Sequence, residues 1–197
     1  MNFPILRGAS AEQFVDYWSA LYHDSREHLY TENIHRERTP ASVYALFEWK
    51  NGGPLSERKK RSVEQNFIAR IDETYSLPDD TSAREFLKRF AHGGAIWRIF
   101  WLHCWRPERF PIYDQHVHRA MVYIREGRCR ELPASDRQKI DAYIDEYLPF
   151  WQGMPHRRGR EVDKALWMFG KFLRLRLCAK ADLTRRWRRQ TVRHVFE

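Results

Sequence analysis

Apolar side chains recur along this chain at the spacing of an α-helix, and this periodicity constrains the fold more than any other feature. Between residues 11 and 30 they stand at Phe14, Tyr17, Trp18, Leu21, Tyr22 and Leu29. Side chains three or four positions apart line one face of a helix, whereas a half-buried strand requires strict alternation. The same spacing continues nearly to the end of the chain, so the sequence predicts an all-α protein.

Breakers and caps divide this pattern into separate helices. We expect helices over about 11–30, 41–49, 56–75, 82–91, 95–105, 115–125, 134–149, 160–180 and 183–195. The turn Asn51-Gly52-Gly53-Pro54 ends the second of these. Ser82 with Glu85 forms a capping-box pattern at the start of the fourth, and Gly127 is expected to follow the sixth as its C-cap.

The length and the cysteine content point to a single reduced domain. A chain of 197 residues buries roughly 70% of its unfolded surface and needs no covalent staples. Cys104, Cys129 and Cys178 are too few and too scattered for a disulfide framework, so we expect free thiols in a cytoplasmic protein. The first residues lack the apolar stretch of a signal peptide, and no apolar run approaches the roughly 20 residues of a membrane span.

The strong positive charge suggests a polyanionic partner. The net charge is +9 and the pI about 9.7, a balance typical of nucleic-acid-binding proteins but also of basic surfaces that serve solubility. Basic side chains gather at residues 58–61 and between residues 174 and 193. From these segments we predict DNA contacts by Lys59, Lys60, Arg186 and Arg189. A solvated helix face would explain either segment equally well.

Two short motifs follow one another in the middle of the chain. In the first, FAHGGAIW, a Gly-Gly turn leaves the amides of Gly93, Gly94 and Ala95 at the start of a helix. Such amides can bind a phosphate, helped by the positive end of the helix dipole, although a turn of this kind also serves simply to join two helices. The second, FPIYDQHVHR, places a lone carboxylate, Asp114, directly before the next helix.

Together these motifs resemble the helix-hairpin-helix DNA glycosylases over residues 86–122. In that superfamily a hairpin close to L-P-G-V-G-x-K is followed, about 18 residues after its lysine, by D-x-H-[VI]-x-R. Here Asp114, His116, Val117 and Arg119 carry the second motif, 18 positions after Ile96. Residues 163–171, DKALWMFGK, are similar to a late helix of archaeal-type 8-oxoguanine glycosylases. The resemblance implies one two-lobed helical domain over 1–197, with lobes near 30–122, which contains the hairpin at 86–105, and 1–29 with 123–197.

The sequence departs from the family pattern at three points. His92 replaces the first glycine of the hairpin, Ile96 stands where the lysine nucleophile would be, and the iron–sulfur cysteines of the endonuclease III branch are missing. The resemblance therefore implies a monofunctional glycosylase that acts without a cofactor and does not cut the strand itself. We expect it to act as a monomer on double-stranded DNA, away from membranes, in base-excision repair or in defence against foreign DNA with modified bases.

A single carboxylate suffices for the chemistry that the resemblance implies. Cleavage of an N-glycosidic bond develops positive charge on the deoxyribose, and Asp114 would stabilise this charge and orient the attacking water. The resemblance also implies that Asp114 caps its own helix. The target base must leave the stack, and the candidates for its pocket are Trp97, Trp101, Tyr113 and His118. Each aromatic ring could instead belong to the core, and each histidine could be an ordinary helix residue.

Two other functions remain open at this point. Asp114, His116 and His118 alternate, so on a strand they would share a face and could serve a metal-dependent nuclease. On a helix only Asp114 and His118 share a face, and no zinc-binding spacing occurs, so we expect no metal. The second alternative is a helix-hairpin-helix DNA-binding module without catalysis, in which Asp114 is retained only as a helix cap.

Overall fold

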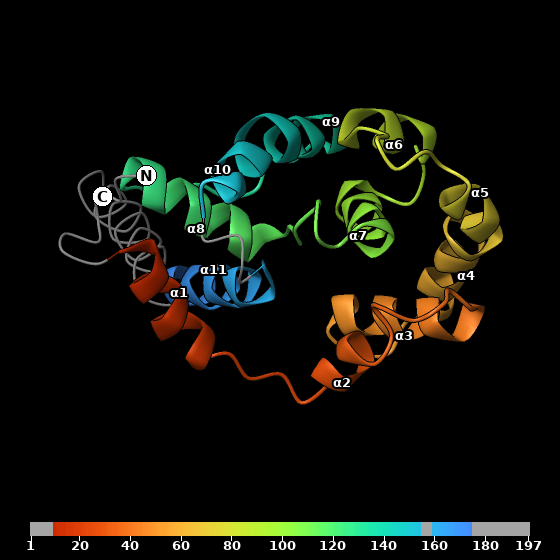
Figure 1. The fold of residues 1–197 in the computed structure, drawn as a ribbon, viewed down its shortest axis with the longest axis horizontal. Helices are drawn as coiled ribbons and strands as arrows, with labels where there is room; N and C mark the ends of the chain where they lie inside the picture. The colour runs from red at the N-terminus through yellow and green to blue at the C-terminus, as the bar shows by residue number, and fades with distance from the viewer. Residues whose placement is uncertain (1–9, 155–158, 175–197) are drawn as a thin grey trace, which may run out of the picture. The chain divides into compact units, whose positions relative to one another are not determined.

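The computed structural model describes residues 10–154 and 159–174, which form two compact units. Unit 1 contains the described residues of 1–22, 114–132 and 152–197, and unit 2 contains residues 23–113 and 133–151. Every regular element in the described ranges is helical and none is a strand, so the predicted all-α class is confirmed (Figure 1). Within the same ranges, none of the helices has the length and apolar character needed to cross a membrane.

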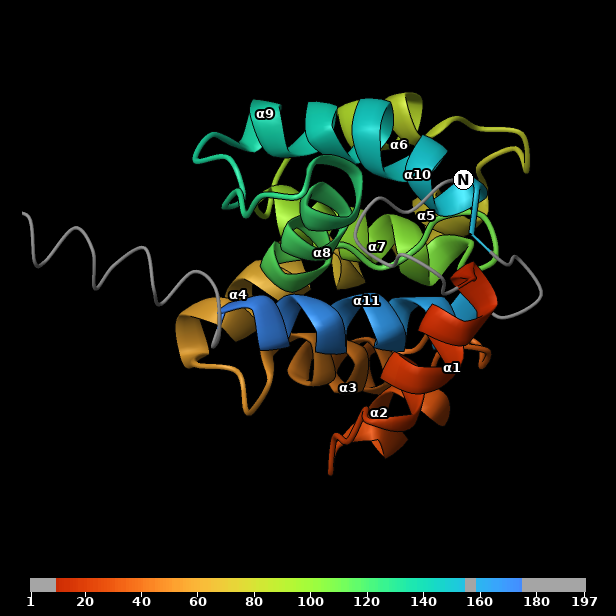
Figure 2. The ribbon, with the colours of Figure 1, turned by 90° about the vertical axis from the view of Figure 1, so that its left-hand side faces the viewer.

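Unit 1 is built around helix α11 (Gly159–Leu173). It packs against α1 (Ala11–Ala20) on one side and α8 (Gln115–Glu126) on the other, as Figure 2 shows. Phe14 of α1 meets Phe169 of α11 edge-on, with their ring centroids 5.4 Å apart. The predicted ends of α8 are confirmed, because Asp114 caps its N-terminus and Gly127 follows it in the left-handed conformation.

Unit 2 encloses a single apolar helix, α7 (Ala95–Trp105), which coincides with its predicted range. Nearly all its side chains are buried, as expected of a helix that is apolar on every side. Figure 1 shows α7 inside a ring of other elements of this unit. These are α2 (Glu27–Thr31), α3 (Pro40–Asn51), α4 (Glu57–Asn66), η1 (Ile68–Arg70), α5 (Ile71–Tyr75), α6 (Ala83–Arg89), α9 (Asp136–Asp141), η2 (Ala142–Tyr147) and α10 (Leu148–Gln152).

Two predicted helices are broken in the structure, and a third changes its helical form along its length. The stretch 11–30 divides after α1, because Asp24 turns the chain by accepting a hydrogen bond from the amide of Arg26 at 2.9 Å. The stretch 56–75 divides at Phe67, whose fully buried ring stacks on Phe47. The stretch 134–149 runs on as α9, η2 and α10, with η2 in the wider π-helical form. The predicted helix 183–195 and the end of 160–180 lie outside the described residues.

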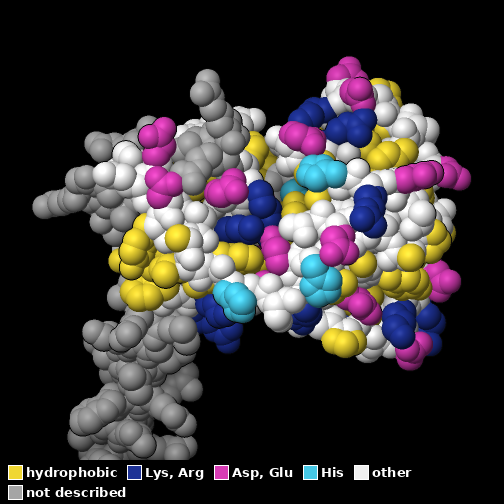
Figure 3. Space-filling model, turned by 60° about the horizontal axis from the view of Figure 1, so that its bottom comes forward, with side chains coloured by type: hydrophobic (Ala, Val, Ile, Leu, Met, Phe, Trp, Pro, Cys, Tyr) yellow, Lys and Arg dark blue, Asp and Glu magenta, His cyan; other side chains and the backbone are white. Residues whose placement is uncertain are grey.

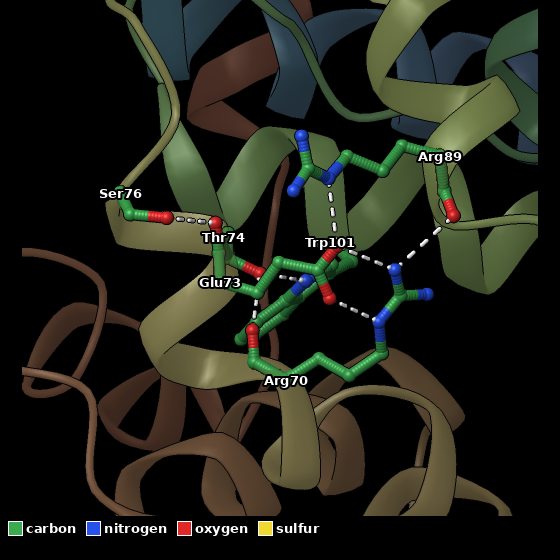
Figure 4. A network of polar contacts seen from close by, with 6 residues as sticks. All are labelled: Arg70, Glu73, Thr74, Ser76, Arg89 and Trp101. Atoms are coloured by element: carbon green, nitrogen blue, oxygen red, sulfur yellow. Dashed lines mark hydrogen bonds and ion pairs between the residues drawn. The ribbon is translucent and has the colours of Figure 1, made fainter.

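Polar side chains fasten α7 to α5, and α5 in turn to α6. The Trp101 indole donates a hydrogen bond to the Thr74 hydroxyl at 3.0 Å, and that hydroxyl donates to the carbonyl of Arg70 (Figure 4). Beside them, Glu73 accepts hydrogen bonds from Arg70 and from Arg89 of α6. The network satisfies the Trp101 indole and the Thr74 hydroxyl. The hydrogen bonds from Arg70, and after them the one from Arg89, lower the pKa of Glu73 to about 2.

Candidate nucleic-acid interface

The Gly-Gly turn joins α6 to α7, and both glycines adopt conformations that other residues rarely take. Gly93 has φ +100°, and a β-carbon there would stand 2.7 Å from the ring of Phe67. Gly94 has φ +82°, but a β-carbon there would meet open space. The backbone at Gly93 is therefore restricted by conformation and by packing, whereas Gly94 is restricted by conformation alone.

A carboxylate of the protein itself accepts the hydrogen bond from the amide at the start of α7. Because Gly94 has no side chain to cap the helix, the amide of Ala95 donates instead to Oδ2 of Asp136, on α9, at 3.0 Å. Oδ1 of Asp136 accepts a hydrogen bond from Lys139 at 3.0 Å. The bond from Lys139, together with that from Ala95, lowers the pKa of Asp136. The position predicted to bind a phosphate thus attracts negative charge.

A groove of about 560 Å³ opens beside this turn, wholly within unit 2. It is lined by Ser56, Arg58, Lys59, Ser62, Gly93, Gly94, Ala95, Ile96, Trp97, Asp136 and Lys139. Three of these side chains are cationic and one is anionic. The groove brings together the predicted phosphate-binding turn, the predicted DNA contact Lys59 and the predicted pocket residue Trp97. Lys60, by contrast, forms an ion pair with Glu57 at 3.0 Å and does not line it.

In unit 1, Asp114 is held at the N-terminus of α8. Its Oδ1 accepts hydrogen bonds from the amides of His116 at 2.8 Å and Val117 at 3.1 Å. The side chain is half-buried rather than sealed within the core. His116 lies against the Trp167 ring, and burial lowers its pKa although the charge of Asp114 opposes this. Asp114 is therefore a fixed carboxylate at a helix start beside an imidazole.

Arg119, the arginine of the D-x-H-V-x-R motif, is buried beneath this helix start. It makes a bidentate pair with Glu131, with Nη2–Oε2 at 2.7 Å, and donates from Nη1 to the carbonyl of Gly170 at 3.1 Å. The side chain of Glu131 is 64% exposed, so the pair reaches from the interior to the solvent. Arg119 thus joins α8 to α11 and to the loop that follows α8.

The other three predicted pocket residues lie in the interior. Trp101 is fully buried among the aromatic rings of unit 2. Tyr113 is fully buried against Tyr143 and Tyr147, and its carbonyl accepts a hydrogen bond from Lys50 at 3.2 Å. His118 is fully buried in unit 1. Of the four predicted residues, Trp97 is the one that faces a groove, with its ring edge-on to Phe47.

The remaining charges of the described surface are mixed in sign. On the face drawn in Figure 3, Lys and Arg side chains are interspersed with Asp and Glu. The predicted contacts Arg186 and Arg189 lie outside the described residues. In the described part of the chain, no three His, Cys, Asp or Glu side chains gather where they could hold a metal ion. The groove is therefore the feature of unit 2 on which an anion-binding hypothesis depends.

Sequence reasoning missed three residues of these sites, namely Glu131, Asp136 and Lys139. Asp136 lies 41 positions from Ala95, so no local pattern connects the two. Arg58 stands in the basic segment 58–61, which did give a usable signal.

Comparison with protein-family models, with curated proteins and with solved structures finds no match to this chain.

Proposed function

We propose that this protein hydrolyses the N-glycosidic bond of a damaged or modified base in DNA, with Asp114 as the catalytic carboxylate. The observation that carries the proposal is the state of Asp114. Two backbone amides donate hydrogen bonds to its Oδ1 and fix the carboxylate. The side chain is only half-buried, so that a substrate could reach it. A carboxylate held in this way needs no reorganisation when positive charge develops on the sugar.

In this proposal the groove of unit 2 contributes the contacts to the DNA backbone. Arg58, Lys59 and Lys139 supply positive charge along it, and the turn at Gly93 and Gly94 lets a strand approach the backbone closely. Trp97 offers a flat apolar face for a base or a sugar. Ile96 lines the same groove and has no amine, so the base would be released by water and not through a Schiff base.

The test is base release from a panel of duplexes, each with one damaged or modified base, scored by alkali cleavage at abasic sites. Asp114→Asn should lower release by at least about a hundredfold, because it removes the charge but retains an oxygen to cap α8. Glu126→Gln is the matched control, since it makes the same chemical change at the exposed end of α8. Borohydride should trap no adduct. Failure of the wild type to release any base of the panel would refute the proposal.

A second candidate is a DNA-binding module without catalysis. The two hydrogen bonds that backbone amides donate to Asp114 favour this candidate specifically. They give this residue a structural purpose, since a helix cap contributes about 1 kcal/mol to stability. This alternative predicts that the wild type binds duplex DNA and releases no base. It also predicts that Asp114→Asn leaves DNA binding unchanged, so a single set of proteins distinguishes the two functions.

A further inference from the structure

The groove of unit 2 contains an anion of its own at the place where a DNA phosphate would bind. One carboxylate oxygen of Asp136 accepts a hydrogen bond from the Ala95 amide, and the other accepts one from the Lys139 ammonium group, at 3.0 Å in each case. Half of its side chain is exposed, so the carboxylate lies at the groove wall and not in the core. One amide and one ammonium group that could serve a phosphate are therefore both occupied by the protein.

We infer that Asp136 competes with the DNA phosphate for the Ala95 amide and Lys139, and so limits how tightly the protein holds undamaged DNA. This inference rests on the proposed function and adds a regulatory residue to the same groove. A DNA strand that enters the groove must displace the carboxylate or bind beside it. Either course weakens the contact, because like charges repel and the cations are partly neutralised.

The charges that line the groove support this competition. Arg58, Lys59 and Lys139 give three positive charges and Asp136 one negative charge, a formal sum of +2. Neutralising Asp136 raises the sum to +3 and releases Lys139 from its partner. Each phosphate that a cation neutralises changes the slope of log K against log salt by about −0.9. Removal of the Asp136 charge should therefore add roughly one such contact.

The test compares two variants with the wild type. Asp136→Asn removes the charge, but the side-chain oxygen of the new asparagine can still accept a hydrogen bond from the Ala95 amide. Asp141→Asn, also on α9, is the matched control, since Asp141 pairs with Arg84 and Arg137 outside the groove. Binding to a short undamaged duplex is measured between about 50 and 200 mM salt. We expect Asp136→Asn to bind about tenfold more tightly, with a slope steeper by about 0.9, and Asp141→Asn to change the slope much less.

The possible outcomes separate this inference from the proposed function. Equal affinities and slopes for the two variants would overturn the competition while DNA binding stands. If neither the wild type nor Asp136→Asn binds the duplex at low salt, both the competition and the proposed function fail. Binding by Asp136→Asn alone would support the competition in its strongest form. Melting curves of all three proteins, with Asp136→Ala as a variant that lacks the cap, show whether loss of folding affects the comparison.

Discussion

The main-chain oxygen of His116 lies 1.9 Å from the position that a β-carbon on Gly170 would occupy. Helices α8 and α11 therefore touch backbone to backbone at the level of Asp114. On the same turn of α11, the carbonyl of Gly170 accepts a hydrogen bond from Arg119. The start of α8 is thus supported by close packing and by a buried guanidinium group, and both act on the segment that carries the candidate carboxylate.

Gly170→Ala should destabilise the protein by about 3 kcal/mol, because the added methyl group cannot fit without separating the two helices. Replacement of glycine by alanine within a helix ordinarily stabilises the helix by up to about 1 kcal/mol. A loss of folding stability in Gly170→Ala would therefore identify the close contact with the main chain of His116. Urea unfolding gives the difference. Gly94→Ala is the comparison, since its β-carbon meets nothing and only backbone strain of about 1 kcal/mol is expected. Equal stability of Gly170→Ala and the wild type would contradict the packing.

Local signals in the sequence were sufficient to predict much of this fold. Helix α7 has its predicted range because glycine precedes it and Arg106-Pro107 follows it. Asp114 and Gly127 mark the ends of α8 because each makes its capping contact within a few residues. The all-α class, the ends of α8 and the capping box at Ser82 follow from such short-range contacts.

The relationships that define the groove could not be predicted, because they join residues far apart in the chain. The bond between Ala95 and Asp136 depends on how α9 packs against α7. Likewise, the burial of Trp101 and Tyr113 depends on neighbours from several helices. The aromatic residue type alone therefore did not show whether these side chains belong to the core or to a pocket. The break after α1 depends on the contacts of the Asp24 side chain with Arg26, which the apolar periodicity does not reveal.

Glu73→Gln should cost about 1 kcal/mol at neutral pH, since Arg70 and Arg89 both donate to this partly exposed carboxylate. The pKa of Glu73 is lowered to about 2, chiefly by Arg70. The advantage of the wild type is therefore complete above the ordinary pKa of 4.5 and is lost as the pH falls toward 2. Chemical denaturation near pH 7 and near pH 3 measures this change. Glu64→Gln, at an exposed site on α4, should show no such dependence.

His116→Gln should make the stability of the protein less sensitive to mild acid. Burial lowers the pKa of His116 below its ordinary 6.5, with further lowering by Arg119, Arg174 and Lys171, while Asp114 opposes it. As the pH falls through 6.5 the unfolded chain takes up a proton before the folded one, so wild-type stability falls.

Unfolding measured near pH 8 and near pH 5.5 should therefore show a smaller change for His116→Gln than for the wild type. His35→Gln is the control, because His35 is exposed. An equal change with pH in all three proteins would mean that the environment of His116 is not the one described.

Trp97→Leu and Trp101→Leu should separate the pocket from the core. Trp97 is half-buried and lines the groove, so its loss should weaken DNA binding by about 1–3 kcal/mol, the usual contribution of one stacked base. Trp101 is fully buried and bonded to Thr74, so its replacement should cost about 3 kcal/mol of folding stability instead. Fluorescence anisotropy with a labelled duplex, at a temperature where both variants are folded, provides the comparison. If Trp101→Leu lowers affinity more than Trp97→Leu does, the base does not bind at Trp97.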